Sequence, residues 1–364
     1  MKTGKRLELV GHGLTQINTA TKLTVIKQCE SVSKKGAMNI IYLGSGEFGL
    51  ESLDALSASK HELRFIVTQP PRPAGRGRKS TPTPVACWAS AHCVRFIQTE
   101  DINTPEIRRE IAGYEPDLIV VVAFGQKIGN ELINLPGPGR AINVHGSLLP
   151  KYRGAAPINW AIINGETETG ISIITLAEKM DAGQILAQRR TAILPDETAG
   201  ELHDRLAKIA APLLLETIDR VADGTAVYSE QDHSQATLAP KLKKSDGFLD
   251  FNEPTEVLAR KIRGLSPWPG AQATYVSKKT QKSLPVTMAR AATIRSGIRD
   301  RGSGIGNQLN LPPGVLDEDL NVVCGSGGLK IIEIKPAGSR LMSFKDFVNG
   351  QQTQPGDMFA KIDA

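Results

Sequence analysis

Three polar residues near the middle of the chain have the side-chain types and spacing needed to transfer a one-carbon acyl group to an amine. Asn143 and His145 stand two positions apart at the end of the apolar run 140–144, and Asp181 follows in the stretch 179–183. If the run is a strand, alternate side chains share a face, so Asn143 and His145 point the same way. An amide and an imidazole can donate to a developing oxyanion, and a carboxylate can move protons. We therefore predict a catalytic site formed by Asn143, His145 and Asp181.

The residues that follow His145 favour this interpretation over a purely structural one. Asn and Asp are common turn formers and a lone His proves little, so each of the three would more often be structural by itself. Here Gly146 lets the backbone turn, and the segment 147–150, Ser-Leu-Leu-Pro, completes a loop that ends at the proline. The combination indicates a site at the end of a strand.

A glycine-rich turn earlier in the chain leaves a second interpretation open. Residues 44–49 read GSGEFG, which matches the dinucleotide-binding fingerprint between an expected strand and an expected helix. That fingerprint also requires an acidic residue at the end of the second strand, where this chain has Gln69, while Glu62 lies before that strand. We favour a tight strand-to-helix turn, with a nicotinamide-dependent oxidoreductase as the alternative.

A basic loop, residues 72–79, follows the second expected strand, at the sheet edge where α/β proteins bind ligands. Its four cations are Arg72, Arg76, Arg78 and Lys79. Residues 38–240 hold 19 Lys and Arg against 24 Asp and Glu, a net charge of −5, so the loop is basic within an acidic region. A solvated surface loop is the plainer alternative. We expect these cations to contact a phosphate backbone.

The order of the expected elements predicts an α/β domain over residues 38–223, and a length of 364 residues suits two domains. Strands that alternate with helices favour a parallel sheet wound on both faces. The last helix opens with a capping box formed by Thr198 and Glu201. The expected strands are 39–43, 63–68, 94–97, 117–123, 141–145, 170–176 and 184–190, and the expected helices are 48–59, 106–113, 157–164 and 198–223.

The rest of the chain has a different texture. Residues 224–240 are polar and are expected to form a linker, and residues 241–364 contain one short helix and several brief strands separated by Gly and Pro. Short strands with such turns predict a small β-barrel. This last part holds 18 Lys and Arg against 12 Asp and Glu, a net charge of +6, which suggests a polyanionic partner.

The remaining composition argues for a cytoplasmic protein without a metal. Residues 1–37 are basic and lack periodicity, so we expect a disordered extension or a start codon chosen in error, with a targeting segment as the alternative. The four cysteines are scattered without zinc-ligand spacing and are expected to stay reduced. No apolar run approaches the roughly 18–20 residues that span a bilayer.

With these residues assembled, the chain resembles the methionyl-tRNA formyltransferases over nearly all of residues 38–364. The matching stretches are 68–79, 142–157 (INVHGSLLPKYRGAAP), 179–183, 241–251 (KLKKSDGFLDF) and 267–270 (PWPG). The Asn-x-His core with a later Asp is shared by the wider group of 10-formyltetrahydrofolate transferases, whereas the basic loop and the C-terminal part are specific to the tRNA-directed members. The resemblance implies a Rossmann-like catalytic domain joined to an OB-like β-barrel.

The resemblance also implies roles for particular residues. Asn143, His145 and Asp181 would be catalytic, and the basic loop and the barrel would hold the acceptor arm of initiator methionyl-tRNA. The co-substrate would be 10-formyltetrahydrofolate, with no metal and no membrane partner, and we expect a monomer. The residues implied to contact the folate are Ser147, Leu148, Leu149 and Pro150.

Two other functions remain open beside the oxidoreductase. One is formyl transfer to a small amine, such as a glycinamide nucleotide or an amino sugar, against which the basic loop and the barrel argue. The other is a non-catalytic RNA-binding protein that retains an enzyme core, against which the complete Asn143, His145 and Asp181 set argues.

Overall fold

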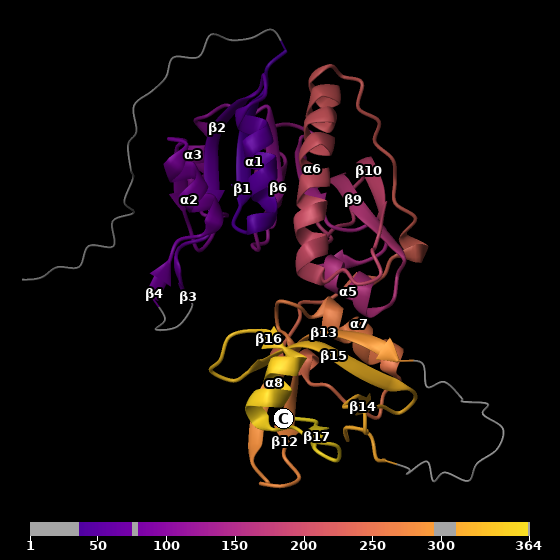
Figure 1. Cartoon of the computed structure of the whole chain (residues 1–364). Helices are drawn as coiled ribbons and strands as arrows, with labels where there is room; N and C mark the ends of the chain where they lie inside the picture. Colours follow the sequence, from indigo (N-terminus) through magenta and orange to yellow (C-terminus); the bar gives the residue numbers. More distant parts are fainter. Residues whose placement is uncertain (1–35, 75–78, 295–310, 363–364) are drawn as a thin grey trace, which may run out of the picture.

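The protein contains two large β-sheets of different architecture, each with its own buried core. The computed structural model describes residues 36–74, 79–294 and 311–362, so most of the expected N-terminal extension lies outside the described residues. Figure 1 shows the first sheet with the long helix α6 beside it, and the second sheet as a separate body at the other end of the molecule. Among the described helices, none is both long enough and apolar enough to cross a membrane.

The first sheet has seven strands in the order β10-β9-β7-β6-β1-β2-β5. The five strands β7-β6-β1-β2-β5 are parallel, and β9 and β10 continue the sheet in antiparallel pairing. The parallel order is that of a Rossmann fold, in which the topological switch point lies between β1 and β6. The strands are β1 (Asn39–Gly44), β2 (Glu62–Thr68), β5 (Phe96–Gln98), β6 (Leu118–Val122), β7 (Ala141–His145), β9 (Glu168–Thr175) and β10 (Ile185–Ala192).

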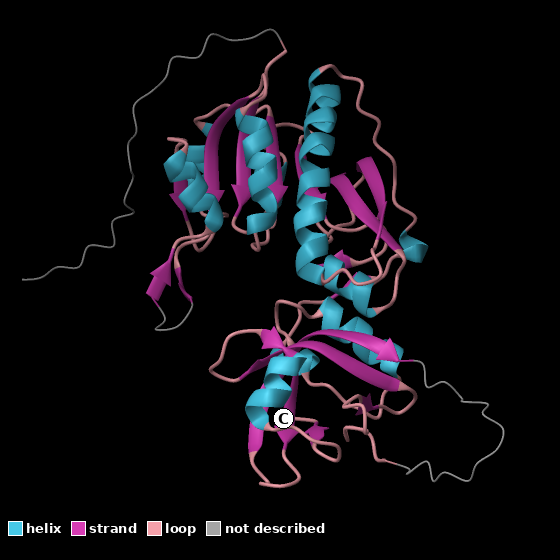
Figure 2. Cartoon of the chain, in the orientation of Figure 1, coloured by secondary structure: helices cyan, strands magenta, loops and turns pink. Residues whose placement is uncertain are grey.

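Helices cover both faces of this sheet (Figure 2). The alternation of side chains along β1 divides the core, since Ile40 and Tyr42 pack with α1, α2 and α6 on one face and Ile41 and Leu43 pack with α3 and α4 on the other. The sequence did not lead us to expect α2 or the hairpin of β3 with β4. The helices and hairpin are η1 (Glu47–Gly49), α1 (Leu50–Ser57), β3 (Arg72–Ala74), β4 (Lys79–Thr81), α2 (Pro84–Ala91), α3 (Pro105–Ala112), α4 (Asn130–Ile133), α5 (Pro157–Ile163) and α6 (Ala199–Ala222).

The glycine-rich turn after β1 is explained by Tyr42, whose ring lies beneath it. A Cβ atom on Gly49 would come within 2.0 Å of the Tyr42 hydroxyl, and one on Gly44 within 2.5 Å of the ring. The hydroxyl donates to the Gly49 carbonyl at 3.1 Å, and burial raises the Tyr42 pKa, so the phenol stays protonated. These contacts support the expectation that the glycines serve a tight turn.

The second sheet is antiparallel and nearly closes into a barrel. Its strands lie in the order β14-β15-β13-β12-β17, with β16 paired to β15. Single bridges join Val315 to Met358 and Leu316 to Val322, which link the two outer strands β17 and β14 across the open side. The elements are η3 (Lys244–Gly247), α7 (Thr255–Gly264), β12 (Ala271–Val276), β13 (Ser283–Ile294), β14 (Val322–Val323), β15 (Gly328–Pro336), β16 (Met342–Ser343), α8 (Phe344–Gln351) and β17 (Met358–Ala360).

The segment expected to form a linker, residues 224–240, packs along the first sheet before the chain reaches the barrel. It contains η2 (His233–Gln235) and β11 (Leu238–Ala239), and β11 pairs in parallel with the two-residue strand β8 (Arg153–Gly154). Beyond it, α7 packs on α5, where Asn159 donates to the Gly264 carbonyl at 2.7 Å. The two sheets are therefore joined by packed helices as well as by the chain.

Candidate active site

Asn143 and His145 lie on the same face at the C-terminal end of β7, as the alternation predicted. Asn143 is opposite Val121 of β6 and Ile174 of β9 in the ladder, and its side chain is half-buried. His145 is buried, while Val144 between them points into the core on the other face. The strand therefore places an amide and an imidazole side by side at the sheet edge where Rossmann folds bind ligands.

The loop after β7 turns back and supplies the partner of His145. His145 Nε2 is 2.8 Å from the carbonyl oxygen of Tyr152, which sits in the left-handed region at φ 62°. Since a carbonyl oxygen can only accept, Nε2 carries a hydrogen. The other nitrogen, Nδ1, is then the ring atom that can gain or lose a proton, and it faces Asp181.

Asp181 reaches the same point from the loop between β9 and β10, the Asp181 loop (residues 179–183). Its Oδ1 is 3.4 Å from Asn143 Nδ2, its Oδ2 is 3.6 Å from His145 Nδ1, and Oδ2 accepts the Gly154 N–H at 2.8 Å. The structure thus brings together all three residues that the sequence singled out. The Asp181 side chain is 12% exposed, so it is sheltered from bulk water but remains accessible.

The backbone of the Asp181 loop is tightly constrained. Asp181 has φ 52°, a left-handed conformation that costs a non-glycine residue free energy. At Gly183 a Cβ atom would lie 1.8 Å from the Thr175 carbonyl oxygen, so no other residue fits there without a backbone shift. The glycine lets the chain pass close to the end of β9, which aims the carboxylate back at β7.

The segment 147–150 forms the wall of the site beside His145. Ser147 and Leu149 are buried, and the Ser147 hydroxyl donates to the Lys151 carbonyl at 2.7 Å. The N–H of Leu149 donates to the Ser172 hydroxyl at 3.0 Å, and its carbonyl accepts from Gln188 at 2.9 Å. Leu148 and Pro150 are only half-buried, so any ligand contact by this segment would come mainly from those two side chains and from the backbone.

The described ends of the basic loop, 72–74 and 79, lie in the paired strands β3 and β4, which form a hairpin. Arg72, on β3, is 3.1 Å from Glu100 and is exposed, and Lys79, on β4, is exposed as well. Arg76 and Arg78 belong to residues 75–78, which lie outside the described residues. The hairpin follows the C-terminal end of β2 (Figure 1). Because β2 and β7 run parallel in one sheet, this is the edge at which Asn143 and His145 lie.

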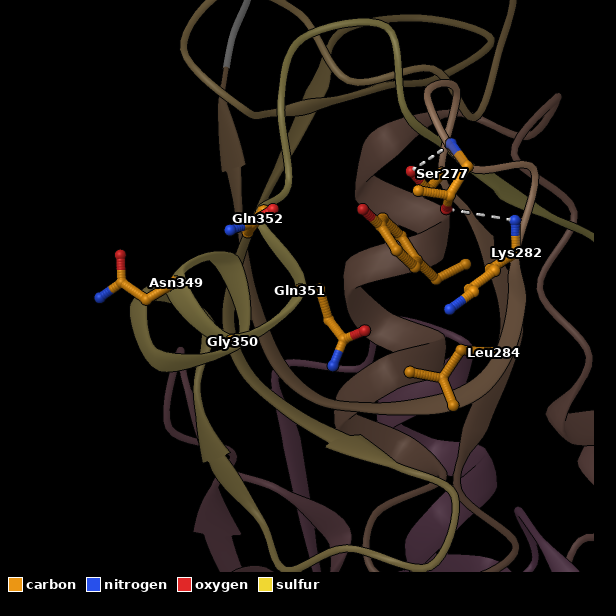
Figure 3. A pocket seen from close by; sticks show the side chains of 9 residues that line it. Ser277, Lys282, Leu284, Asn349, Gly350, Gln351 and Gln352 are labelled. Atoms are coloured by element: carbon orange, nitrogen blue, oxygen red, sulfur yellow. Dashed lines mark hydrogen bonds between the residues drawn. The ribbon is translucent and has the colours of Figure 1, made fainter.

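A pocket elsewhere on the molecule contains none of the residues predicted from the sequence. It encloses about 260 Å³ on the barrel, between the β12–β13 hairpin and the end of α8. In Figure 3 the side chains of Lys282 and Gln351 extend into this pocket near Leu284.

Sequence reasoning missed the residues that hold the site together. Gly154 and Tyr152 contribute backbone groups, and both lie within a stretch that carried the family resemblance. Gln231, whose side chain donates to the carbonyls of Asp181 and Gly183, lies in the expected linker, where no periodic pattern pointed to a role. A backbone donor or acceptor has no signature in residue type, which is why these contacts needed the structure.

A Rossmann-ordered sheet that gathers an amide, an imidazole and a carboxylate at its C-terminal edge suits transfer of an acyl group. Residues 38–218 match the family model described as formyl transferase, and residues 241–352 match the formyl transferase, C-terminal domain. The fold, the site and these matches define a formyl transferase.

The sequence relatives narrow the class further. A methionyl-tRNA formyltransferase of Citrifermentans bemidjiense is 39% identical over 327 residues, 90% of this chain and 98% of the relative. One from Geobacter sulfurreducens is 40% identical over 319 residues, 88% of this chain and 96% of the relative. The chain belongs to the methionyl-tRNA formyltransferase family.

Solved structures share the fold at low sequence identity. HypX from Aquifex aeolicus in complex with tetrahydrofolic acid aligns with a TM-score of 0.55 and 16% identity, covering 85% of this chain and 47% of that chain. WlaRD, a sugar 3N-formyl transferase, aligns with a TM-score of 0.56 and 15% identity, covering 83% of this chain and 99% of that chain. The fold of this chain therefore occurs in other solved structures, among them a sugar 3N-formyl transferase.

Proposed function

We propose that this protein transfers the formyl group of 10-formyltetrahydrofolate to the α-amine of methionyl initiator tRNA. The observation that carries the proposal is the convergence of Asn143, His145 and Asp181, with the Asp181 carboxylate 3.4 Å from the Asn143 amide and 3.6 Å from the His145 ring. Relatives named methionyl-tRNA formyltransferase support the acceptor. HypX, whose structure holds tetrahydrofolic acid, supports a folate donor.

Asn143 and His145 would stabilise the charge that develops on the formyl oxygen. One N–H of the Asn143 amide is directed at Asp181, which leaves its other N–H to donate to that oxygen. His145, whose Nε2 is fixed on the Tyr152 carbonyl, offers a second donor when Nδ1 is protonated. Loss of one oxyanion donor typically lowers the rate by about 10²–10³.

Asp181 would act as the general acid–base group of the reaction. A free α-amino group has a pKa of about 8, so near neutral pH much of it is protonated and cannot attack until that proton leaves. The ammonium form loses that first proton to solvent. The attacking nitrogen must lose a second proton to become an amide, and the carboxylate can accept it, directly or through one water, as the nitrogen bonds to the formyl carbon. As the carbon–nitrogen bond to the donor breaks, this proton passes to the departing folate nitrogen, for which His145 and Asp181 are placed. General acid–base help is worth about 10²–10⁴ in rate.

Binding of the two substrates would use different surfaces. Leu148, Pro150 and the backbone at Ser147 and Leu149 would contact the folate beside His145. Contacts to the tRNA phosphates would come from the basic-loop cations Arg72, Arg76, Arg78 and Lys79 and from the barrel, residues 241–364, whose net charge is +6. In this proposal residues 38–223 form the catalytic domain and residues 224–240 the linker. The enzyme acts in the cytoplasm as a monomer, and light scattering would check the oligomeric state.

The deciding experiment supplies a labelled 10-formyl donor together with methionyl initiator tRNA. We expect label in the initiator tRNA and much less in an elongator methionyl-tRNA control. Label in a glycinamide nucleotide or an amino sugar, but not in tRNA, would reassign the acceptor. Binding of tRNA without consumption of the formyl donor would indicate a non-catalytic protein. A change in nicotinamide fluorescence when the cofactor is mixed with the protein would favour the alternative function of an oxidoreductase.

A further inference from the structure

A single buried amide in the linker bonds directly to the loop that carries Asp181. Gln231 is 4% exposed, and it lies between the two ranges matched by the family models, 38–218 and 241–352. Its Nε2 donates to the carbonyl of Asp181 at 2.8 Å and to the carbonyl of Gly183 at 2.7 Å. One side chain thus binds the backbone of the Asp181 loop both at Asp181 itself and at Gly183, near the end of the loop.

The other end of the same amide is bound to Arg153. Gln231 Oε1 accepts from Arg153 Nε at 3.2 Å and from an Arg153 Nη at 2.7 Å. Both hydrogens and both lone pairs of the amide are therefore used. Rotating the amide by 180° would set its NH₂ against the guanidinium donors and its oxygen against two carbonyls, so only one orientation is favourable.

Arg153 stands between the two backbone groups that fix the site. The residue before it, Tyr152, provides the carbonyl that accepts from His145, and the residue after it, Gly154, provides the N–H that donates to Asp181. Gln231 therefore connects the segment that orients the imidazole to the loop that orients the carboxylate.

Backbone pairing on both sides of Gln231 holds it in place. Ser229 exchanges two backbone hydrogen bonds with Ile185, at 2.8 and 2.9 Å. Thr237 accepts from the N–H of Tyr152 through its hydroxyl and from the N–H of Arg153 through its carbonyl, both at 2.8 Å. The linker is fixed against both segments that the amide joins, so the amide has little freedom to move away from the loop.

We propose that Gln231 is a positioning residue for catalysis, which holds Asp181 at its distance from Asn143 and His145. This inference rests on the proposed formyl transfer. Asp181 has a left-handed backbone conformation, which persists only when surrounding contacts enforce it, and Gln231 bonds to its carbonyl. A displacement of about 1 Å in a catalytic group can lower a rate about 10²-fold.

The test uses two substitutions of Gln231 in the full chain. Gln231→Glu keeps an acceptor for Arg153 but places an oxygen against the two loop carbonyls, and Gln231→Met keeps the length without any hydrogen bond. The matched control is Gln235→Ala, an exposed linker residue whose side-chain amide bonds to Asp232. We expect kcat to fall about 10- to 100-fold in both Gln231 variants, with each KM within about threefold of the parent and a changed pH profile of kcat. The control should match the parent, and a kcat within about twofold of it in both Gln231 variants would overturn the proposal.

Two further measurements separate positioning from general stability. If Gln231 acts through Asp181, then Gln231→Glu added to Asp181→Asn should lower kcat little further, whereas losses that multiply would refute that route. Hydrogen exchange should become faster at Gly154 and at residues 179–184 but not in the core strands β1 and β6, and unchanged exchange at the loop would count against the proposal. If the parent chain does not formylate methionyl-tRNA, the proposed function fails, and this exchange measurement still decides whether Gln231 orders the loop.

Discussion

Replacing Asp181 by Asn tests the proton chemistry with almost no change in side-chain volume. The carboxylate accepts from Gly154 and Asn143 and faces His145. An asparagine has one oxygen: if that oxygen takes the Gly154 N–H, its NH₂ faces the Asn143 NH₂, and in the other orientation the NH₂ meets Gly154 and the imidazole. Either orientation sets donor against donor and removes the group that accepts a proton.

The expected loss can be worked out from these contacts. Removal of a general acid–base group lowers kcat by about 10²–10⁴, which at 1.36 kcal/mol per tenfold is about 3–5 kcal/mol of transition-state stabilisation. The effect on folding should be small, because one weakened hydrogen bond costs about 1 kcal/mol. For a catalytic domain of this size, that is a fall in Tm of about 2–4 °C.

The assay follows label from the formyl donor into methionyl initiator tRNA at saturating tRNA, with Tm measured on the same preparation. Asp204→Asn, on α6, is the matched control because its side chain is 76% exposed. A kcat for Asp181→Asn within about threefold of that control would refute the assigned role. A fall in activity accompanied by a Tm loss far above 4 °C would show that the carboxylate is needed chiefly for folding.

Three further predictions concern the site and the two cores. Asn143→Ala should lower kcat about 10²–10³-fold while leaving Tm close to the parent, and near-normal turnover would remove the amide from the oxyanion site. Burial raises the Tyr275 pKa to about 12, helped by the hydrogen bond that its hydroxyl donates to the buried Asp357. Because Tyr275→Phe removes this bond to a carboxylate, it should lower the free energy of unfolding of the barrel in urea by about 1.5–3 kcal/mol, and an unchanged midpoint would contradict this. Burial lowers the His61 pKa from 6.5, although Asp219 opposes the shift. The folded chain thus binds a proton at His61 less readily than the unfolded chain does. The stability that comes from neutral His61 is fully present above pH 6.5 and is lost as the pH falls towards the lower folded pKa. His61→Gln should flatten this part of the curve of unfolding free energy, measured in urea, against pH.

The first sheet could be predicted because its strands are apolar runs of the right length between helical patterns. The shared face of Asn143 and His145 also followed from their spacing, since a strand has a fixed alternation. That Asp181 lies beside Asn143 and His145 was expected because the proposed reaction needs a carboxylate there, and no spacing in the sequence predicted it. Its position requires a glycine at residue 183, because a Cβ atom there would lie 1.8 Å from the Thr175 carbonyl oxygen. Such a close approach between two segments cannot be predicted from a sequence pattern.

Other features were out of reach of the sequence for similar reasons. Closure of the barrel depends on which residues Val315 and Leu316 bridge to, namely Met358 and Val322, and a strand pattern does not reveal pairing partners. The helix α8 has eight residues, and the family resemblance gave no reason to separate it from the strands around it. Gln231 lies in a polar stretch, and its partners are backbone carbonyls and an arginine 78 positions away.

The parallel pairing of β11 with β8 bears on how such a chain can be divided or recombined. A truncation after Ala222, at the end of α6, would remove Gln231 and Thr237 and leave the N–H groups of Tyr152 and Arg153 without these acceptors. An excised catalytic fragment should therefore extend through Ala239, whose carbonyl accepts from Ala156. By the same reasoning, a fusion event that exchanges the barrel for another module has its natural crossover point near residue 240 rather than where the long helix stops.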